Sequence, residues 1–168
     1  MWNGPTWPHA NSLVLTAMAR TLRLYGKCSL TRRKLYELFH SYTMAQYLNQ
    51  DYTFPWTGEY YNGDTGKWKT NQRDYNHSTY NDILIEVLLG IVPRPDGVLE
   101  IHPLVPEGVW DHFLLDGQYY HGHDITLAWD APDGKDYYGD NFEGFAVYVD
   151  GRRVATLSHI GRITYKLD

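Results

Sequence analysis

The distribution of helix-breaking residues constrains the fold of this chain more than any other feature. From residue 93 onward, Pro and Gly recur at short intervals and break up any helical pattern. In most of the preceding sequence, apolar residues recur every three to four positions, as they do on one face of a helix. We therefore expect an α+β fold, with helical hairpins over residues 1–93 and a small antiparallel, sandwich-like β domain over residues 94–168.

Helices are predicted at three places before the Pro-rich part. The first spans residues 11–26 and the second residues 29–49, and the short connection between them predicts an antiparallel αα-hairpin. A third helix is expected to start near Asn76 or Ser78, to carry apolar residues as far as Ile91, and to be ended by Gly90 and Pro93. The buried face of the first helix is predicted from an apolar stripe with helical spacing, with Leu15 and Ala19 beside it: Val14, Met18, Leu22 and Tyr25.

Strand-like runs follow residue 93, each rich in apolar residues and bounded by turn residues. The clearest pair flanks the dipeptide Asp150-Gly151, which is a typical hairpin turn. Because neighbouring runs are joined by short turns, the expected sheet is antiparallel. Strands are predicted at residues 98–102, 110–115, 125–129, 145–149, 154–157 and 163–167.

Charge and composition narrow the classes of partner. The formal net charge is -5 and basic residues form no long run, which argues against nucleic-acid binding. No apolar run approaches the length needed to cross a membrane. The single cysteine, Cys28, excludes an internal disulfide and does not decide the compartment.

Two histidines in the β region are a candidate pair of metal ligands. His121 and His123 are two residues apart, so on a strand both imidazoles would lie on one face, with Asp124 adjacent. A polar turn accounts for the same residues, and we predict no metal site. No Gly-rich phosphate loop is present, so we predict no cofactor.

The stretch from Phe54 to Asp82 carries the densest chemistry of the chain. Glu59 follows Gly58 there and lies in sequence among tryptophan and tyrosine residues. Aromatic rings offer flat apolar faces together with polar edges, which suits the binding of a sugar ring. Hydrolysis of a glycosidic bond usually needs paired carboxyl groups, and Glu59 has a suitable setting for one of them. From the spacing alone, an isolated glutamate in an aromatic loop is more often a surface carboxylate than a catalytic residue.

Two motifs in a fixed order extend this interpretation. Residues 2–8 read WNGPTWP, residues 58–66 read GEYYNGDTG, and helical patterns separate and follow them. Over roughly residues 2–105 the chain resembles the C-terminal part of the six-hairpin, (α/α)6-barrel glycosidases. The similarity is to glycoside hydrolase family 63 and to mannosylglycerate-hydrolase-like and trehalase-like enzymes. The carbohydrate substrate that this implies is an α-linked gluco- or manno-type sugar, cleaved with inversion.

The resemblance implies roles for individual residues. Glu59 would be the general base of an inverting reaction. The sugar pocket would be shaped by residues of both motifs, with Asn3 at a position where many relatives have Arg, and with a histidine from the start of the third helix. Its expected substrate-binding residues are Trp2, Asn3, Gly4, Trp7, Tyr60 and His77.

The general acid has no counterpart in this sequence. Relatives place it on an aspartate well upstream of the first motif, and neither Asp51 nor Asp64 matches that position. Three helices also cannot close a barrel of six hairpins. The expectation is therefore a C-terminal fragment of a longer glycoside hydrolase, with little or no activity by itself.

Two other functions remain open at this point. The chain could be a non-catalytic carbohydrate-binding module that uses its tryptophans as stacking surfaces. It could also be an oligomerisation module, in which exposed helix faces pair with a second copy or with the remaining barrel.

Overall fold

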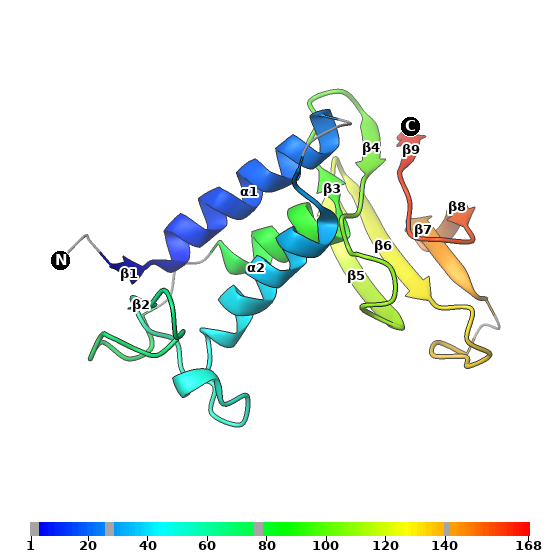
Figure 1. Ribbon diagram of the computed structural model, residues 1–168. Helices are drawn as coiled ribbons and strands as arrows, with labels where there is room; N and C mark the ends of the chain where they lie inside the picture. The colour runs from blue at the N-terminus through cyan, green and yellow to red at the C-terminus, as the bar shows by residue number, and fades with distance from the viewer. Residues whose placement is uncertain (1–3, 26–28, 76–78, 140–141) are drawn as a thin grey trace. The chain divides into compact units, whose positions relative to one another are not determined.

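The computed structural model of the protein describes residues 4–25, 29–75, 79–139 and 142–168. It confirms the α+β class, with helices in the first part and antiparallel sheets in the second (Figure 1). Contacts divide the chain into two compact units, Met1–Val87 and Leu88–Asp168. The functional division into domains 1–93 and 94–168 stays a prediction. Each unit is described by itself.

Helix α1 (Pro8–Leu24) begins three residues before the predicted residue 11 and ends before the predicted residue 26. Trp7 is the N-cap, with extended backbone, and Pro8 opens the helix. Proline suits this position because its fixed φ is already helical and its missing N–H would have no partner in the first turn. The extended backbone at Trp7 thus continues directly into the helix.

The predicted buried face of α1 is wrong in part. Val14 and Tyr25 are 49% and 64% exposed. The helix has apolar residues on two sides, and the pattern alone does not decide which side packs inward. The side that is buried carries Pro8, Ser12, Leu15 and Ala19.

Helix α2 (Arg32–Met44) packs against α1 and is capped by Thr31, whose hydroxyl accepts from the Lys34 amide (Figure 1). It is shorter than the predicted 29–49, because the chain turns at Ala45 and continues into the short 3-10 helix η1 (Leu48–Gln50). Its buried residues Leu35, Phe39 and Tyr42 recur at the three- to four-residue spacing of one helix face. The αα-hairpin is therefore confirmed.

A third helical segment follows residue 79 and differs from the prediction in type. It consists of one turn of α3 (Tyr80–Asp82) and the π-helix η2 (Ile83–Leu89). Asn76 and Ser78, the predicted starting points, lie outside the described residues. Hydroxyl groups tie its beginning to the hairpin: the Ser12 oxygen lies 2.8 Å from that of Thr79 and 3.4 Å from that of Tyr42.

The second unit contains two antiparallel sheets. A three-stranded sheet has the order β3-β4-β9, and a four-stranded sheet has the order β5-β6-β7-β8. Ile91–Val92, expected at the end of a helix, forms β3 instead. The strand bounds are β3 (Ile91–Val92), β4 (Val98–Ile101), β5 (His112–Tyr120), β6 (His123–Asp130), β7 (Gly144–Val149), β8 (Arg152–Leu157) and β9 (Ile163–Lys166).

The core of this unit follows the two-residue alternation of its strands. Ile125 and Leu127 of β6 are fully buried, as are Phe145 and Val147 of β7, and they share one face of the four-stranded sheet. The next residues along each strand lie on the second, opposite face of this sheet.

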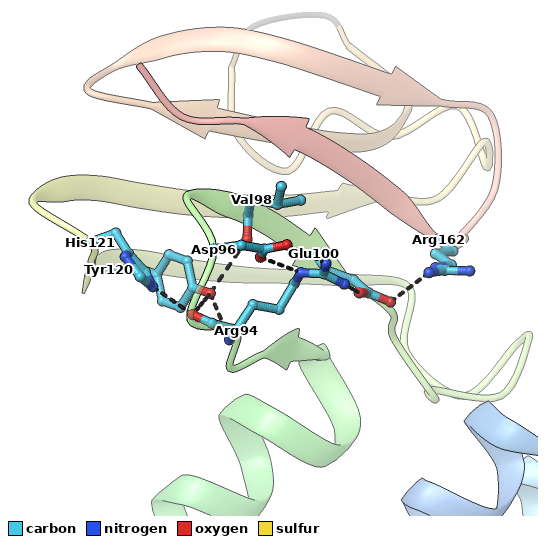
Figure 2. Close-up of polar contacts among 7 residues, drawn as sticks. All are labelled: Arg94, Asp96, Val98, Glu100, Tyr120, His121 and Arg162. Atoms are coloured by element: carbon cyan, nitrogen blue, oxygen red, sulfur yellow. Dashed lines mark hydrogen bonds and ion pairs between the residues drawn. The ribbon is translucent and has the colours of Figure 1, made fainter.

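A polar network around Arg94 fixes the entry into this unit (Figure 2). The Arg94 guanidinium donates to Asp96 at 2.7 and 2.6 Å and to Glu100 at 2.7 Å. Arg162 pairs with the other Glu100 oxygen at 2.9 Å. The Arg94 backbone is held as well: its amide donates to the Tyr120 hydroxyl, and its carbonyl accepts from His121 Nε2. The network joins strands β4 and β5 to the segment before β9.

Glu100 is the buried centre of the network. Burial raises the pKa of its carboxyl, but hydrogen bonds from Arg94 and Arg162 outweigh burial, and the pKa lies below its usual value. A lowered pKa means that ionised Glu100 stabilises the fold above the usual glutamate range. That contribution is lost as the pH falls through the lowered pKa.

We predict that Glu100→Gln lowers the free energy of unfolding by about 1.5–3 kcal/mol at pH 7, because a charged acceptor between two guanidinium groups is lost. Chemical unfolding followed by far-UV circular dichroism measures this. The difference from the wild type should shrink once the pH is below about 4. A difference that stays constant from neutral to acidic pH would contradict the assigned role of the carboxylate.

Candidate active site

The two sequence motifs meet in the first unit. Strand β1 (Pro5–Thr6) pairs antiparallel with β2 (Tyr61–Asn62), so that Pro5 faces Asn62 and Thr6 faces Tyr61. Residues more than fifty positions apart thus lie side by side (Figure 1). The N-terminal segment therefore has a partner within this chain, which sequence reasoning did not identify.

The loop around β2 is ordered by its own backbone. The Asn62 amide donates to the Lys67 carbonyl at 2.8 Å, and an antiparallel β-bridge pairs the backbone of Tyr61 with that of Trp68. The Asn62 side chain accepts from the amides of Asp64 and Thr65 and so closes the turn. These contacts make a short, tight hairpin of the GEYYNGDTG motif and hold its first residues in place.

Gly58 is required by a close contact. A Cβ atom at this position would lie 2.8 Å from the Trp68 indole and 3.0 Å from the Thr70 side chain. The Gly58 amide donates to the hydroxyl of Tyr61, which is fully buried. Burial raises the pKa of Tyr61, so its hydroxyl stays protonated over the physiological range. The residue before Glu59 is thus held on two sides.

Aromatic rings surround this position. The rings of Trp7 and Tyr60 lie 5.0 Å apart between centroids, in a tilted arrangement. Trp56 and Trp68 meet edge to face at 5.0 Å, and the Arg73 guanidinium lies over the Trp56 ring. The indole N–H groups of Trp56 and Trp68 are buried and have no hydrogen-bond partner among the described residues. Aromatic contacts therefore involve residues that come shortly before and directly after Glu59 in the sequence.

Glu59 itself is half-buried. Among the described residues, none forms a hydrogen bond or ion pair with its carboxylate. Gly4, at the other motif, is exposed and has φ +109°, a backbone conformation that favours glycine. Three of the expected site residues lie outside the described residues: Trp2, Asn3 and His77. The roles of all these residues remain predictions.

A pocket of about 210 Å³ lies beside the same strand pair and was not foreseen. Thr6, Tyr61 and Asn62 contribute to its wall, together with Asn11 of α1 and polar residues near the end of α2. Glu59, Tyr60 and Trp7 are not part of the wall. The predicted catalytic residue therefore does not line this pocket, although later residues of the same GEYYNGDTG motif do.

The comparisons with known proteins agree with the motifs. Residues 1–78 match the family model of the mannosylglycerate hydrolase MGH1-like glycoside hydrolase domain. That range contains both motifs and the αα-hairpin, so this part of the chain is similar to a glycoside hydrolase domain. The narrower resemblance to family 63 and to a complete six-hairpin barrel stays a prediction.

A solved structure described as a sialidase is similar over nearly the whole chain. The two share 36% sequence identity over 97% of this chain, with a TM-score of 0.85. This chain spans only 15% of the length of that protein. Both units therefore have counterparts in one short segment of a much longer structure.

The histidines considered for metal binding are held by protein groups. His121 Nε2 donates to the Arg94 carbonyl, and His123 Nδ1 lies 2.8 Å from Asp150 Oδ2. The hydrogen bond to Asp150 raises the pKa of His123. Over the described part of the chain, no group of three potential metal ligands comes together, and no helix is long and apolar enough to cross a membrane.

We predict that Gly58→Ala destabilises the helical unit by about 1–3 kcal/mol, because the new methyl group overlaps the Trp68 indole and no flexible side-chain end can yield. Thermal unfolding followed by tryptophan fluorescence measures this. Gly63→Ala is the matched control, since its Cβ would meet nothing closer than 3.9 Å. Equal stability of both variants would show that the packing around Gly58 is not tight.

Proposed function

We propose that this chain is part of an inverting glycoside hydrolase and carries its general base, Glu59, but not its general acid. The substrate would be an α-linked gluco- or manno-type sugar. The match of residues 1–78 to a glycoside hydrolase domain supports the class of reaction. The base, the inversion and the sugar are inferences from the motif and its setting.

The observation that carries the proposal is the pairing of the two motifs. The β1–β2 pair and the Trp7–Tyr60 contact bring a tryptophan of the first motif next to the residue that follows Glu59. A catalytic carboxylate needs a sugar ring held at a defined distance. An aromatic wall joined by backbone pairing to the segment that carries Glu59 can provide that.

The state of Glu59 fits the role of a base. In an inverting reaction the base must accept a proton from a water molecule on one face of the sugar. A carboxylate tied up in an ion pair would be a poor proton acceptor. Glu59 is half-buried and has no ion pair with any described residue, so its oxygens stay available to a water molecule.

Two carboxyl groups of the first unit have a shifted pKa, and neither fits the role of the acid. A general acid needs a raised pKa, whereas hydrogen bonds from the Thr53 hydroxyl and amide lower the pKa of Asp51. Glu86 has a raised pKa, caused mainly by burial and by Asp82. However, the Glu86 carbonyl is bound by Arg23, near the end of α1 remote from Trp7.

The length of α1 excludes a pairing of Glu86 with Glu59. From Trp7 to Arg23 the helix rises by about 24 Å, at 1.5 Å per residue. The paired carboxylates of inverting enzymes lie only about 6.5–9.5 Å apart. We infer that the acid comes from another part of a longer protein.

We predict that Glu59→Gln weakens binding of a cationic iminosugar to this chain by about ten-fold or more, because a charge-assisted contact is lost. Isothermal titration calorimetry with gluco- and manno-configured iminosugars measures the affinity. Asp64→Asn is the matched control: it removes one negative charge from the same hairpin at an exposed position. It should leave the affinity within about two-fold.

An equal loss of iminosugar affinity in both variants would mean that the effect comes from the overall negative charge of the hairpin. That result would contradict the assignment of Glu59. Turnover of aryl α-glucosides or α-mannosides by this chain, abolished by Glu59→Gln, would contradict the missing acid. Sugar binding that depends on Trp7 but not on Glu59 would instead support a non-catalytic carbohydrate-binding module.

Exposed apolar residues on α1 favour oligomerisation as a second candidate function. Leu13, Val14 and Leu24 are 60%, 49% and 74% exposed. In a longer enzyme, neighbouring helices would cover such a face, and without them a second copy could do so.

We predict that sedimentation velocity shows concentration-dependent self-association, and that the double variant Leu13→Lys and Val14→Lys abolishes it. Lysine at both positions places charge on the exposed face without touching the buried face of α1. A monomeric wild-type chain at high concentration would exclude this candidate.

A further inference from the structure

The second face of the four-stranded sheet carries a pocket that no part of the proposed function uses. Its volume is about 360 Å³, within the range of small-molecule sites. Strands β5, β6 and β7 form its floor, and the segment after β6 forms one side. The lining residues are Leu114, Asp116, Thr126, Ala128, Asp130, Tyr138, Phe142, Tyr148 and Gly151.

The floor follows directly from the strand register. Leu114 lies opposite Ala128, and Thr126 lies opposite Tyr148, so these side chains share one face. They alternate with the core residues on the opposite face. Thr126 donates to Asp116 at 2.6 Å, which gives the floor one polar edge beside an apolar centre.

Unsatisfied polar atoms mark the wall of this pocket. Asp130 is only 2% exposed, and its Oδ2 accepts from the Tyr137 amide at 3.1 Å. Among the described residues, its Oδ1 has no hydrogen-bond partner, and neither has the buried hydroxyl of Tyr138. Burial and the negative charge of Asp130 raise the pKa of Tyr138, so its hydroxyl keeps its proton.

Buried polar atoms without a hydrogen-bond partner are uncommon, because each gives up hydrogen bonds to water without replacing them. By contrast, both oxygens of Glu100 in the same unit are bound by guanidinium groups. Asp130 and Tyr138 both line this pocket, and each has a buried polar atom without a partner among the described residues, one an acceptor and one a donor. This indicates a place for a ligand group that can serve both.

The chemistry of that group can be narrowed. An ammonium group donates but does not accept, so it would serve Asp130 and leave the Tyr138 proton without an acceptor. An anionic group would meet the carboxylates of Asp116 and Asp130, and the lining contains no Lys or Arg. Arg153 lies over the Phe142 ring, 4.8 Å from its centroid, and is not part of the lining. A hydroxyl group donates and accepts at once.

We propose that this pocket binds a neutral saccharide, with one hydroxyl group donating to Asp130 Oδ1 and accepting from the Tyr138 hydroxyl. The apolar floor and the Tyr148 side chain would contact the C–H face of the sugar ring. Since both polar atoms are buried, the Tyr138 side chain must rotate to admit the hydroxyl group. The site is independent of Glu59 and does not rest on the proposed catalytic role.

The test is a titration of the whole chain with methyl α-mannoside and methyl α-glucoside, followed by NMR of backbone amides on β6 and β7. Tyr138→Phe should weaken binding about three- to ten-fold, which corresponds to one lost hydrogen bond. It should leave the melting temperature unchanged or raise it, because an unsatisfied hydroxyl is removed.

Matched controls separate this site from its neighbours. Tyr137→Phe removes a hydroxyl from the adjacent residue, where it contacts Asp133 and Lys135 outside the pocket, and should keep the affinity. Glu59→Gln should also keep it. Loss of binding in Glu59→Gln but not in Tyr138→Phe would place the sugar at the other site and overturn this inference.

Two further results would also overturn it. If neither glycoside shifts the amides of β6 and β7 at about 10 mM, where even weak binding would register, the polar pair has no saccharide partner. If choline, a cation without the ring of hydroxyl groups, binds the same strands more tightly than both glycosides, the ligand class is wrong.

Discussion

The pairing of Thr6 with Tyr61 is the contact on which the candidate active site depends. It is a short stretch of antiparallel backbone, yet it joins segments more than fifty residues apart and buries Tyr61 completely. Tyr61 then accepts from the Gly58 amide, and Trp68 closes over Gly58. Each of these contacts restricts the backbone next to Glu59. Without the strand pair, Trp7 and the carboxylate would belong to separate segments.

The β unit contains buried carboxylates in two different states. Glu100 has an arginine on each oxygen, and its environment favours the ionised form. Asp130 is equally buried but has one oxygen without a partner. The first arrangement accounts for the stability of the entry into this unit. The unpaired oxygen of Asp130 does not stabilise the fold in the same way, and it therefore supports the proposed ligand site.

Local sequence patterns were sufficient for much of the fold. The αα-hairpin and the Asp150-Gly151 turn were predicted because spacing and turn residues act over a few positions. The face on which α1 packs was predicted wrongly in part, since Val14 and Leu15 are both apolar and only the position of α2 distinguishes them. The π-helix at Ile83–Leu89 was also missed, because its pattern of apolar residues resembles that of an ordinary helix.

By itself, the sequence determined the α+β class, the αα-hairpin, the strands from residue 98 onward and the two motifs around Trp7 and Glu59. These depend on residue type and short-range spacing. Only the tertiary structure decided that β1 pairs with β2, that Gly58 lies against Trp68, and that Asp130 and Tyr138 share the wall of a pocket. Contacts of this kind depend on how distant segments pack, and the free energy of packing is a property of the whole arrangement rather than of any local pattern.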